Sequence, residues 1–263
     1  MRPGFLWFLL CGDSTDVRLL RLLRNGIRTA QITVVDEEYI RIDIRGVVAT
    51  GHVYLYFLHG RFWENHPFSA ASSVIEQSDV DAKKESIYLG PEIDMEKSPP
   101  KSSGAVVRSV GRRSVEPGTV LYLRILDGAT STLRLKSRVK VLIEGSYGTH
   151  QDFSEYPTLI CIAGGVGVTS CLPYLRAHPG NAFLYWGSRS QALVDSFKPL
   201  TNDFNTEIVV GQRLNLSTIL EEQRGDFAVV VSGPADMMDE TRSIVSKLAR
   251  ARSIKFVPES FSF

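Results

Sequence analysis

TLICIAGGVGVTS, residues 158–170, is the part of the chain that says most about its architecture. TLICIAGG is a continuous apolar run, which is typical of a parallel strand whose sheet is covered on both faces. Three of residues 164–167 are glycines, and residues 170–177 have a helical pattern. The stretch therefore predicts a buried strand, a sharp turn and a helix, which together are the repeating unit of a parallel sheet.

The same alternation continues to the C-terminus. Further strands are expected at AFLYWGS (182–188), TEIVVG (206–211), FAVVVSG (227–233) and IKFVP (254–258), with helices at 191–197, 217–223 and 237–251. Strands that alternate with helices indicate a parallel sheet with helices on both faces. We therefore predict an α/β domain over residues 156–263.

The first half of the chain has a different pattern. Short apolar stretches at 31–35, 39–44, 52–58, 105–110, 119–126 and 139–145 are separated by polar or glycine-containing turns, as in antiparallel strands. Residues 72–104 interrupt the pattern with charged residues, serines and a Pro-Pro pair, and we expect a long polar excursion there. The closely spaced strands predict an all-β domain over residues 29–152, closed as a barrel or a sandwich.

Composition excludes several functional classes. Lys and Arg number 30 against 29 Asp and Glu, so the chain has no overall basic field for a nucleic-acid backbone. Cys11, Cys161 and Cys171 lack close spacing, which argues against a structural metal, a cluster or a disulfide framework and favours a reducing compartment. His52, His59 and His66 recur every seven residues, but strand geometry points such residues to opposite faces, so we predict no metal site.

Residues 1–28 form a separate N-terminal segment. Its apolar run at 5–11 is far shorter than the roughly 20 residues that span a bilayer. Residues 13–26 predict a basic amphipathic helix, with Gly26 as its C′ residue. Two interpretations remain open: the leucines of this helix pack on the protein, or residues 5–28 contact a membrane surface.

Two glycine-bearing strand ends indicate where a ligand binds. The loop at residues 164–167 lets the backbone approach a ligand, and the free N–H groups of the next helix favour an anion such as a diphosphate. Alone, such a loop is as often a tight connection. Ser232-Gly233-Pro234 ends a second buried strand before another helix, and ligands of open parallel sheets bind at such ends. The pair predicts a nucleotide across the carboxyl edge of the sheet.

The all-β half carries His66-Pro67-Phe68-Ser69, expected at the end of a strand, and a second segment, LYLRILDGATSTL (121–133). The tetrapeptide by itself is more simply a turn with core packing. Taken with the glycine motifs, however, the chain from about Thr29 onward resembles the flavin and nicotinamide module of ferric reductases and NADPH oxidases, in the ferredoxin-reductase-like superfamily. The resemblance implies an antiparallel β-barrel that binds FAD, followed by a Rossmann-like NAD(P)-binding domain.

For FAD, HPFS resembles the ferric-reductase motif H-P-F-[ST]. The resemblance implies that Phe68 lies against the isoalloxazine, that Ser69 bonds near flavin N5, and that His66, beside Pro67, stands near the diphosphate where relatives have arginine. A hydroxyl suits N5 because it both donates and accepts. The resemblance further implies FAD contacts at Arg124, Gly128, Thr130, Gly145 and Gly148, with Ser146 where the family has proline.

For the nicotinamide nucleotide, AGGVGVTS resembles A-G-G-x-G-[IV]-T-P, with Ser170 in place of proline. SGP resembles C-G-P, with Ser232 where the family has the cysteine that flanks the nicotinamide. PESFSF resembles the ending E-S-F-[TS]-W and implies that Phe261 or Phe263 shields the flavin. The positions implied for this nucleotide are Gly164, Gly165, Gly167, Thr169, Ser232, Gly233 and Pro234, while Arg189 and Arg213 are candidates for a 2′-phosphate, which favours NADPH over NADH.

These parts predict an FAD-dependent NAD(P)H oxidoreductase of the ferric reductase type. Hydride would pass from the nicotinamide to flavin N5, and single electrons would pass on to a metal, a haem or another small acceptor. The alternatives are a degenerate module that binds nucleotide without turnover, and an NADPH-oxidase-type fragment that reduces oxygen. The haem-bearing membrane helices of full-length relatives are not expected in this chain, which we place in the cytoplasm or at the cytosolic face of a membrane.

Overall fold

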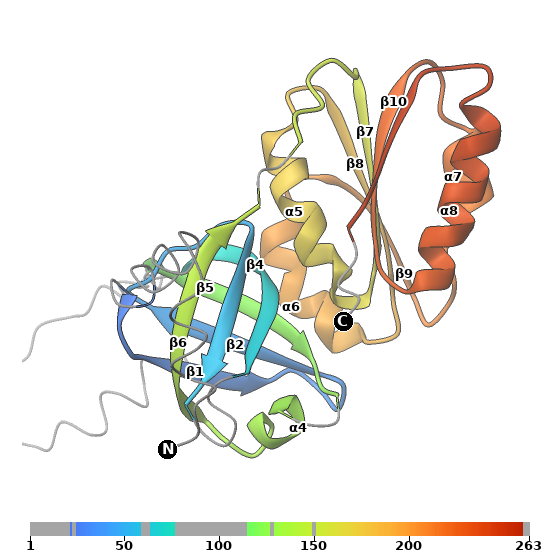
Figure 1. The fold of residues 1–263 in the computed structure, drawn as a ribbon. Coiled ribbons are helices and arrows are strands. Elements are labelled where there is room, and N and C mark those ends of the chain that lie inside the picture. Colours follow the sequence, from blue (N-terminus) through green and yellow to red (C-terminus); the bar gives the residue numbers. More distant parts are fainter. Residues whose placement is uncertain are drawn as a thin grey trace, which may run out of the picture.

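The computed structural model describes residues 22, 25–58, 64–76, 115–126, 129–148 and 151–259. A closed antiparallel barrel comes first in the chain, and a five-stranded parallel sheet with helices on both faces follows it (Figure 1). The predicted fold class is confirmed. The sequence left open whether the first half closes as a barrel or as a sandwich, and the structure shows a barrel.

Six strands close the barrel in the order β1-β2-β5-β4-β3-β6. Alternation builds it: on β2, for example, Ile40, Ile42 and Ile44 are fully buried inside, while the residues between them face outward. A short helix, α4, connects β5 to β6. The elements are β1 (Arg28–Val34), β2 (Tyr39–Arg45), β3 (His52–Phe57), β4 (Asn65–Glu76), β5 (Val115–Arg124), α4 (Ala129–Leu133) and β6 (Arg138–Tyr147).

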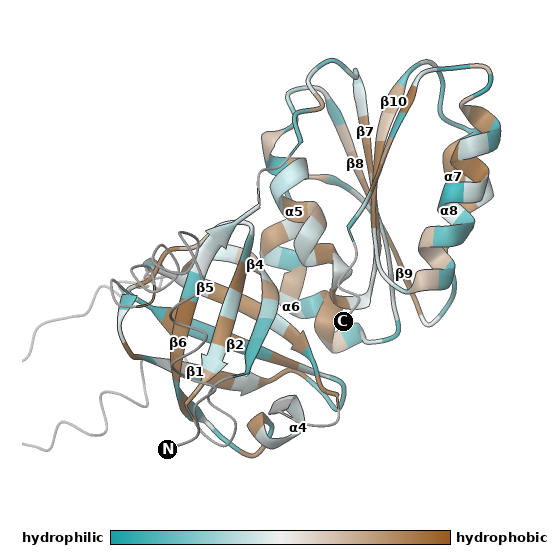
Figure 2. Cartoon of the chain, in the orientation of Figure 1, coloured by the Kyte–Doolittle hydropathy of each residue, from teal (hydrophilic) through white to brown (hydrophobic). Residues whose placement is uncertain are grey.

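The parallel sheet has the strand order β11-β10-β7-β8-β9. Its inner strands β7 and β10 are almost entirely buried and apolar (Figure 2), because helices cover both faces. Helices α5 and α6 pack on one face, and α7 and α8 on the other. The elements are β7 (Thr158–Gly164), a 3-10 turn (Gly165–Gly167), α5 (Val168–Ala177), β8 (Asn181–Ser188), α6 (Gln191–Thr201), β9 (Asn205–Val210), α7 (Leu216–Glu221), β10 (Phe227–Ser232), α8 (Ala235–Leu248) and β11 (Ile254–Pro258).

Barrel and sheet share one hydrophobic cluster. Tyr122 of β5 packs its ring 4.1 Å, centroid to centroid, from that of Phe197 on α6, and its hydroxyl donates to the Ser196 carbonyl at 3.2 Å. Arg176 of α5 donates to the carbonyl of Ala71 on β4 at 3.1 Å. The two halves are therefore joined by buried apolar surface as well as by the connecting chain.

Two local predictions need correction. The polar excursion was placed too early, because residues 72–76 continue β4 and pair with β5; the rest of 72–104 lies outside the described residues. The HPFS segment lies near the start of β4 rather than at a strand end, since these residues pair with β3 before β4 passes over to β5. Residues 144–147 form the irregular end of β6, where its register with β3 shifts.

Little of the N-terminal segment falls within the described residues. Gly26 has φ +60° and its N–H donates to the Leu22 carbonyl at 2.9 Å, which matches its predicted role as a C′ residue. Residues 1–21 lie outside the described part. Within that part, no helix is both long and apolar enough to cross a membrane.

Candidate active site

The two glycine-bearing loops lie side by side because β7 and β10 are neighbours, with Ser232 opposite Ala163. A Cβ added to Gly167 would lie 2.3 Å from the Ser232 carbonyl oxygen, and one added to Gly164 would lie 2.7 Å from Pro234 Cδ. Gly233 is equally confined, with Gly164 Cα 3.0 Å from its missing Cβ. These glycines let the two loops pack in direct contact. Packing is therefore one reason for glycine at these positions, in addition to the close approach of a ligand that the sequence predicts.

The helices that follow the glycine loops differ from the other helices of the sheet in how their N-termini are capped. Helices α6 and α7 begin with side-chain caps, in which Ser190 accepts from the Leu193 N–H and Asn215 accepts from the Thr218 N–H. Helix α5 continues directly from the 3-10 turn Gly165–Gly167, whose Gly165 carbonyl accepts the Val168 N–H, and this turn begins at Gly164 with no side-chain cap. Helix α8 also lacks a side-chain cap but carries Asp236 in its first turn. The uncapped start of the 3-10 turn therefore suits the diphosphate that the sequence predicts at this edge.

The barrel meets this edge through the HPFS segment. Ser69 Oγ lies 3.3 Å from Ser170 Oγ at the start of α5, although the two residues are 101 positions apart. Ser170 and the adjacent Thr169 are buried, and the Thr169 hydroxyl donates to the Val166 carbonyl at 3.0 Å. The residue expected beside the flavin and the loop expected at the nicotinamide nucleotide are thus brought together by the fold.

Ser232 is the least satisfied polar group of this region. It is 1% exposed, and its hydroxyl has no hydrogen-bond partner among the described residues. A buried hydroxyl without a partner is unfavourable, which makes this position unusual. Within the loop pair it lies against Gly167, with its Oγ 3.0 Å from the Cβ position there.

On the barrel, His66 and Phe68 lie stacked, with ring centroids 6.5 Å apart. Burial lowers the pKa of His66, and the nearby Glu64 carboxylate opposes that shift. The imidazole is therefore neutral at neutral pH. Pro67, which lies between these two residues in sequence, pairs with Tyr54 of β3.

The second predicted FAD segment, residues 121–133, lies only partly within the described residues. Arg124 is the last residue of β5 and is about half exposed, with an ion pair to Glu38 at 3.5 Å. Thr130 uses its hydroxyl locally, because Oγ1 donates to the Leu126 carbonyl and accepts from the Leu126 N–H, both at 2.9 Å. Gly128 lies outside the described residues.

At the end of β6, Gly145 and Gly148 have φ values of +133° and +92°, conformations that favour glycine. Ser146, in place of the family proline, accepts a hydrogen bond from the Thr50 N–H at 2.9 Å. The Ser146 hydroxyl thus joins the end of β6 to Thr50 by a hydrogen bond. Sequence patterns missed Glu144, a fully buried carboxylate that accepts from the Tyr56 and Tyr147 hydroxyls.

The two arginines suggested for a 2′-phosphate follow neighbouring strands of the sheet. Arg189 comes directly after β8 and is exposed, while Arg213 follows β9 and is 89% exposed, 3.4 Å from Asp236 in the first turn of α8. Ser190, next to Arg189, donates to the Asp36 carboxylate of the barrel. Asp236 beside Arg213 and Asp36 beside Ser190 place negative charge near both positions, which is unfavourable for binding a phosphate.

Two tyrosines at the site were not predicted. The buried Tyr39 of β2 has its hydroxyl 2.9 Å from the Cβ position of Gly165, and its pKa is raised chiefly by burial. Tyr174 of α5 donates to the Glu259 carboxylate, and burial, followed by that hydrogen bond, raises its pKa. Tyr174 thereby fixes the chain directly before Phe261 and Phe263, which lie outside the described residues. Tyrosines in a β-strand and a helix carry no distinctive signal, so only tertiary structure reveals these roles.

Comparison with known proteins gives a consistent result at low identity. The chain is 22% identical over 232 residues to ferric reductase transmembrane component 5 of Saccharomyces cerevisiae. The aligned region covers 81% of this chain and 28% of that protein. No protein-family model matches the chain. It therefore spans little more than a quarter of the length of this curated relative.

Solved structures agree on the fold. Full-length CYP116B46 from Tepidiphilus thermophilus superposes with a TM-score of 0.61 at 12% identity, over 90% of this chain and 29% of that one. An NADH-dependent reduced ferredoxin-NADP oxidoreductase superposes with a TM-score of 0.53 at 14% identity, over 83% of this chain and 71% of that one. In sequence the chain thus resembles the ferric reductases, and in fold, a closed antiparallel barrel followed by a parallel α/β sheet, it resembles these ferredoxin-reductase-like structures.

Proposed function

We propose that this protein is an FAD-dependent NAD(P)H oxidoreductase of the ferric reductase type. The observation that carries the proposal is the meeting of Ser69 with the uncapped start of α5, at 3.3 Å from Ser170. An oxidoreductase of this class needs a flavin contact and a nucleotide-binding edge close together, because hydride transfer requires donor and acceptor atoms about 3–3.5 Å apart.

The described residues fit both nucleotides. The glycine loop after β7, whose 3-10 turn begins without a side-chain cap, suits a diphosphate, and Arg124, at the end of β5, suits the phosphates of FAD. Ser69 and Phe68 would hold the isoalloxazine, and Ser232 would lie against the nicotinamide. When bound, FAD would take hydride from NAD(P)H and release electrons singly.

The protein residues would contribute placement rather than acid–base chemistry. Ser69 can donate to or accept from flavin N5, and Ser170 beside it can hold its hydroxyl in one orientation. Phe261 or Phe263 would shield the flavin, with Glu259 anchoring the segment before them. Because Asp236 pairs with Arg213 and Asp36 bonds to Ser190, we infer only a modest preference for NADPH over NADH.

The acceptor would be a small molecule, a metal chelate or a haem that reaches the exposed flavin edge. The N-terminal residues 5–28 would contact the cytosolic face of a membrane, and otherwise the protein would act in the cytoplasm. Oxygen would be the acceptor if the chain is an NADPH-oxidase-type fragment. Nucleic acid is not an expected partner.

Purified protein tests the proposal directly. Reconstitution with FAD is expected to give a yellow protein, and anaerobic NADPH is expected to bleach the flavin absorbance. Steady-state oxidation of NADPH and of NADH with ferric chelate, cytochrome and oxygen would then identify the acceptor. A protein that stays colourless with FAD, or a bound flavin that NADPH and NADH leave oxidised, would contradict the proposal.

A second candidate is a module that binds nucleotide without turnover. The observation that favours it is the replacement of three family residues by Ser146, Ser170 and Ser232, of which Ser232 is buried without a partner. Under this hypothesis, FAD binds but is not reduced, either in the native chain or in Ser232→Cys. Flavin reduction in either form would exclude it.

A further inference from the structure

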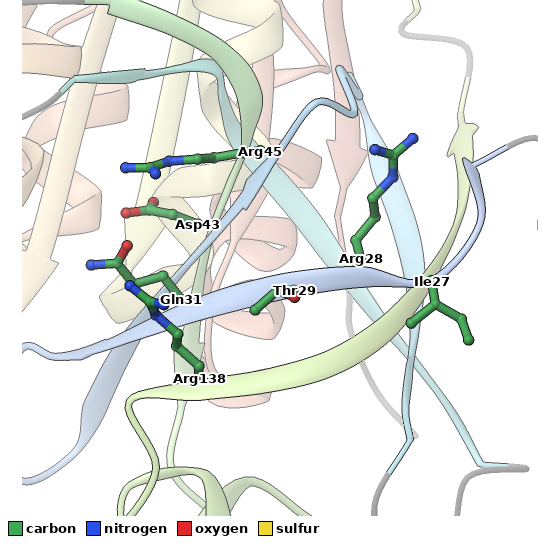
Figure 3. Close-up of a pocket in the computed structure, with 7 residues that line it drawn as sticks. All are labelled: Ile27, Arg28, Thr29, Gln31, Asp43, Arg45 and Arg138. Carbon is green, nitrogen blue, oxygen red and sulfur yellow. The ribbon is translucent and has the colours of Figure 1, made fainter. Parts of the chain in front are cut away.

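The outer wall of the barrel has an open hollow, but the charged side chains around it do not converge on one point. Thr29 and Gln31 face the hollow from one side of β1 (Figure 3). Arg28 leaves this strand on the other side, and its guanidinium points away from Arg138 and Arg45 (Figure 3). A polar group that the fold places more specifically lies elsewhere, at the junction between the barrel and the sheet.

That group is the hydroxyl of Tyr39, the first residue of β2. Tyr39 is only 5% exposed. Its backbone N–H donates to Asp36 at 2.8 Å, but its hydroxyl makes no hydrogen bond within the described part of the chain. Buried tyrosine hydroxyls ordinarily have a partner. The Tyr39 hydroxyl is therefore a donor that the fold positions and that the described residues do not use.

This hydroxyl lies over the glycine turn that follows β7. It is 2.9 Å from the position that a Cβ of Gly165 would occupy. Gly165 also has φ +54°, a conformation that favours glycine, so two separate constraints exclude a side chain there. A ligand group that approaches the turn at Gly165 therefore comes close to the Tyr39 hydroxyl.

Both the hydroxyl and the turn are held in place by the protein itself. Asp36 accepts from the N–H groups of Glu38 and Tyr39, each at 2.8 Å, which fixes the start of β2. The Tyr39 ring belongs to the hydrophobic cluster that the two halves share. On the other side, the indole N–H of the fully buried Trp186 donates to the Gly165 carbonyl at 2.8 Å. Donor and turn are thus preorganised, so little conformational entropy is lost when a ligand binds.

The charges around Tyr39 keep its hydroxyl protonated. Burial, reinforced by Glu38 and Asp36, raises the pKa of Tyr39, while Arg124 and Arg189 oppose that shift. The phenol therefore remains a donor at neutral pH. Glu38 is already paired with Arg124 at 3.5 Å, and Asp36 bonds to the backbone end of Tyr39, away from the hydroxyl. A neutral donor with an exposed guanidinium nearby, that of Arg189, suits a phosphate oxygen.

Strand order indicates which part of a dinucleotide this donor meets. The strand that ends at the glycine turn, β7, lies between β10, which ends at Ser232, and β8, which Arg189 follows. In the proposed function the nicotinamide lies at Ser232, and Arg189 is a candidate for the 2′-phosphate on the adenosine side. The diphosphate that joins the two nucleotides then crosses the turn at Gly165, where the Tyr39 hydroxyl lies.

We propose that Tyr39 is a nucleotide-binding residue supplied by the barrel, and that its hydroxyl donates a hydrogen bond to the diphosphate of the nicotinamide nucleotide at the turn of Gly165. Tyr39 acts at the site of the proposed function, on which this inference rests. The barrel then contacts the nicotinamide nucleotide as well as FAD, so that binding of the nucleotide also holds the barrel and the sheet together.

The test compares two hydroxyl deletions within the shared cluster. Tyr39→Phe removes a hydroxyl that has no partner among the described residues, whereas Tyr122→Phe removes one that donates to the Ser196 carbonyl at 3.2 Å. The full chain is incubated with excess FAD, so that ADP-ribose does not compete for the flavin site. Binding of ADP-ribose and of NADP⁺ is measured by calorimetry, and thermal unfolding is measured without either ligand.

Tyr39→Phe is expected to bind both ligands about tenfold more weakly, because a hydrogen bond to a charged phosphate is lost. Its unfolding midpoint should stay the same or rise, since no bond within the protein is lost. Tyr122→Phe should show the reverse, with native affinity and a lower midpoint. ADP-ribose has neither the nicotinamide nor the 2′-phosphate, so a loss for NADP⁺ alone would overturn the assignment to the diphosphate.

Two outcomes separate this inference from the proposed function. If the native chain binds both ligands and Tyr39→Phe binds them equally well, the role of Tyr39 is wrong and the proposed function stands. If the native chain binds neither ligand, the nucleotide-binding edge itself is wrong and both fall.

The kinetics of flavin reduction give an independent readout. Tyr39→Phe should need about tenfold more NADPH for half-saturation at an unchanged limiting rate, because a diphosphate contact contributes equally before and during hydride transfer. An unchanged half-saturation with a lower limiting rate would contradict a role in binding.

Discussion

At the scale of single residues, Ser232 and His66 have the environments that most affect the proposed chemistry. Ser232 stands where the resemblance to ferric reductases implies a cysteine, whereas His66 matches the histidine of their H-P-F-[ST] motif. Ser232 is buried without a hydrogen-bond partner among the described residues, and His66 is partly buried beside Phe68. Each therefore makes a distinct prediction.

Ser232→Cys is expected to raise both stability and the rate of flavin reduction. The thiol has a weaker need for a hydrogen bond than the hydroxyl, so burial costs less, and the free energy of unfolding should rise by about 1 kcal/mol. Urea unfolding and anaerobic stopped-flow reduction measure the two effects. Ser188→Cys is the control, because the buried Ser188 hydroxyl has partners in Ser190 and its replacement should destabilise.

His66 should make stability depend on pH. Burial lowers its pKa in the folded state, so the unfolded state takes up a proton first as the pH falls. The stabilising effect of the neutral imidazole is complete above the ordinary histidine pKa of about 6.5 and is lost below it. The free energy of unfolding of the native chain should therefore fall more steeply below that pH than that of His66→Gln. Parallel profiles for the two proteins would contradict this assignment.

At the scale of secondary-structure elements, the contact between two loops organises the site. The loop after β7 and the loop after β10 pack glycine against backbone, and they leave α5 and α8 without side-chain caps. The close approach of the loops is a consequence of the glycines, because a Cβ at Gly164, Gly167 or Gly233 would meet the facing loop. A single methyl group is enough to test this arrangement.

Gly167→Ala is expected to reduce stability by about 1–3 kcal/mol through overpacking. Gly167 has φ −57° and ψ −18°, which alanine adopts freely, so the effect comes from the 2.3 Å approach of Cβ to the Ser232 carbonyl oxygen. Affinity for NADPH should fall as well, because the loop must move. Gly187→Ala, whose nearest contact would be an ordinary 3.4 Å, is the control for urea unfolding and nucleotide titration. Equal effects in both variants would exclude the loop contact as the cause.

At the scale of the whole molecule, the barrel and the sheet are predicted to be energetically coupled. Leu121 and Tyr122 are neighbours on β5, but Leu121 faces the barrel interior and Tyr122 packs on Phe197 of α6. The shared cluster controls the distance between the two halves, and the proposed function depends on that distance because it needs a flavin close to the glycine loops. Loss of the cluster should therefore affect elements on both sides of it.

Tyr122→Ala is expected to cost about 3–5 kcal/mol and to increase amide exchange in α6 and β8 as well as in β5, because it opens the shared cluster. Leu121→Ala should increase exchange chiefly in the barrel strands. Hydrogen–deuterium exchange with peptide mass spectrometry separates the two patterns. Unchanged protection of α6 in Tyr122→Ala would show that the halves are stable independently.

The sequence alone predicted those features that depend on local pattern. The apolar run at 158–163 and the alternation in β2 report burial of each residue directly, so the parallel sheet and the all-β half could be recognised. The strand IKFVP was located with its correct ends, and Gly26 was placed correctly because a C′ glycine has a local conformational cause. The domain boundaries and the roles of the site residues stay predictions.

Pairings between distant residues could only come from the tertiary structure. Ser69 and Ser170 are 101 residues apart, and no local pattern states that β4 passes from β3 to β5 beside the start of α5. The contact between Tyr39 of the barrel and Gly165 of the sheet likewise depends on how the two halves pack. Periodicity determines which face of an element is buried, whereas the partner of that face is chosen by packing of the entire chain.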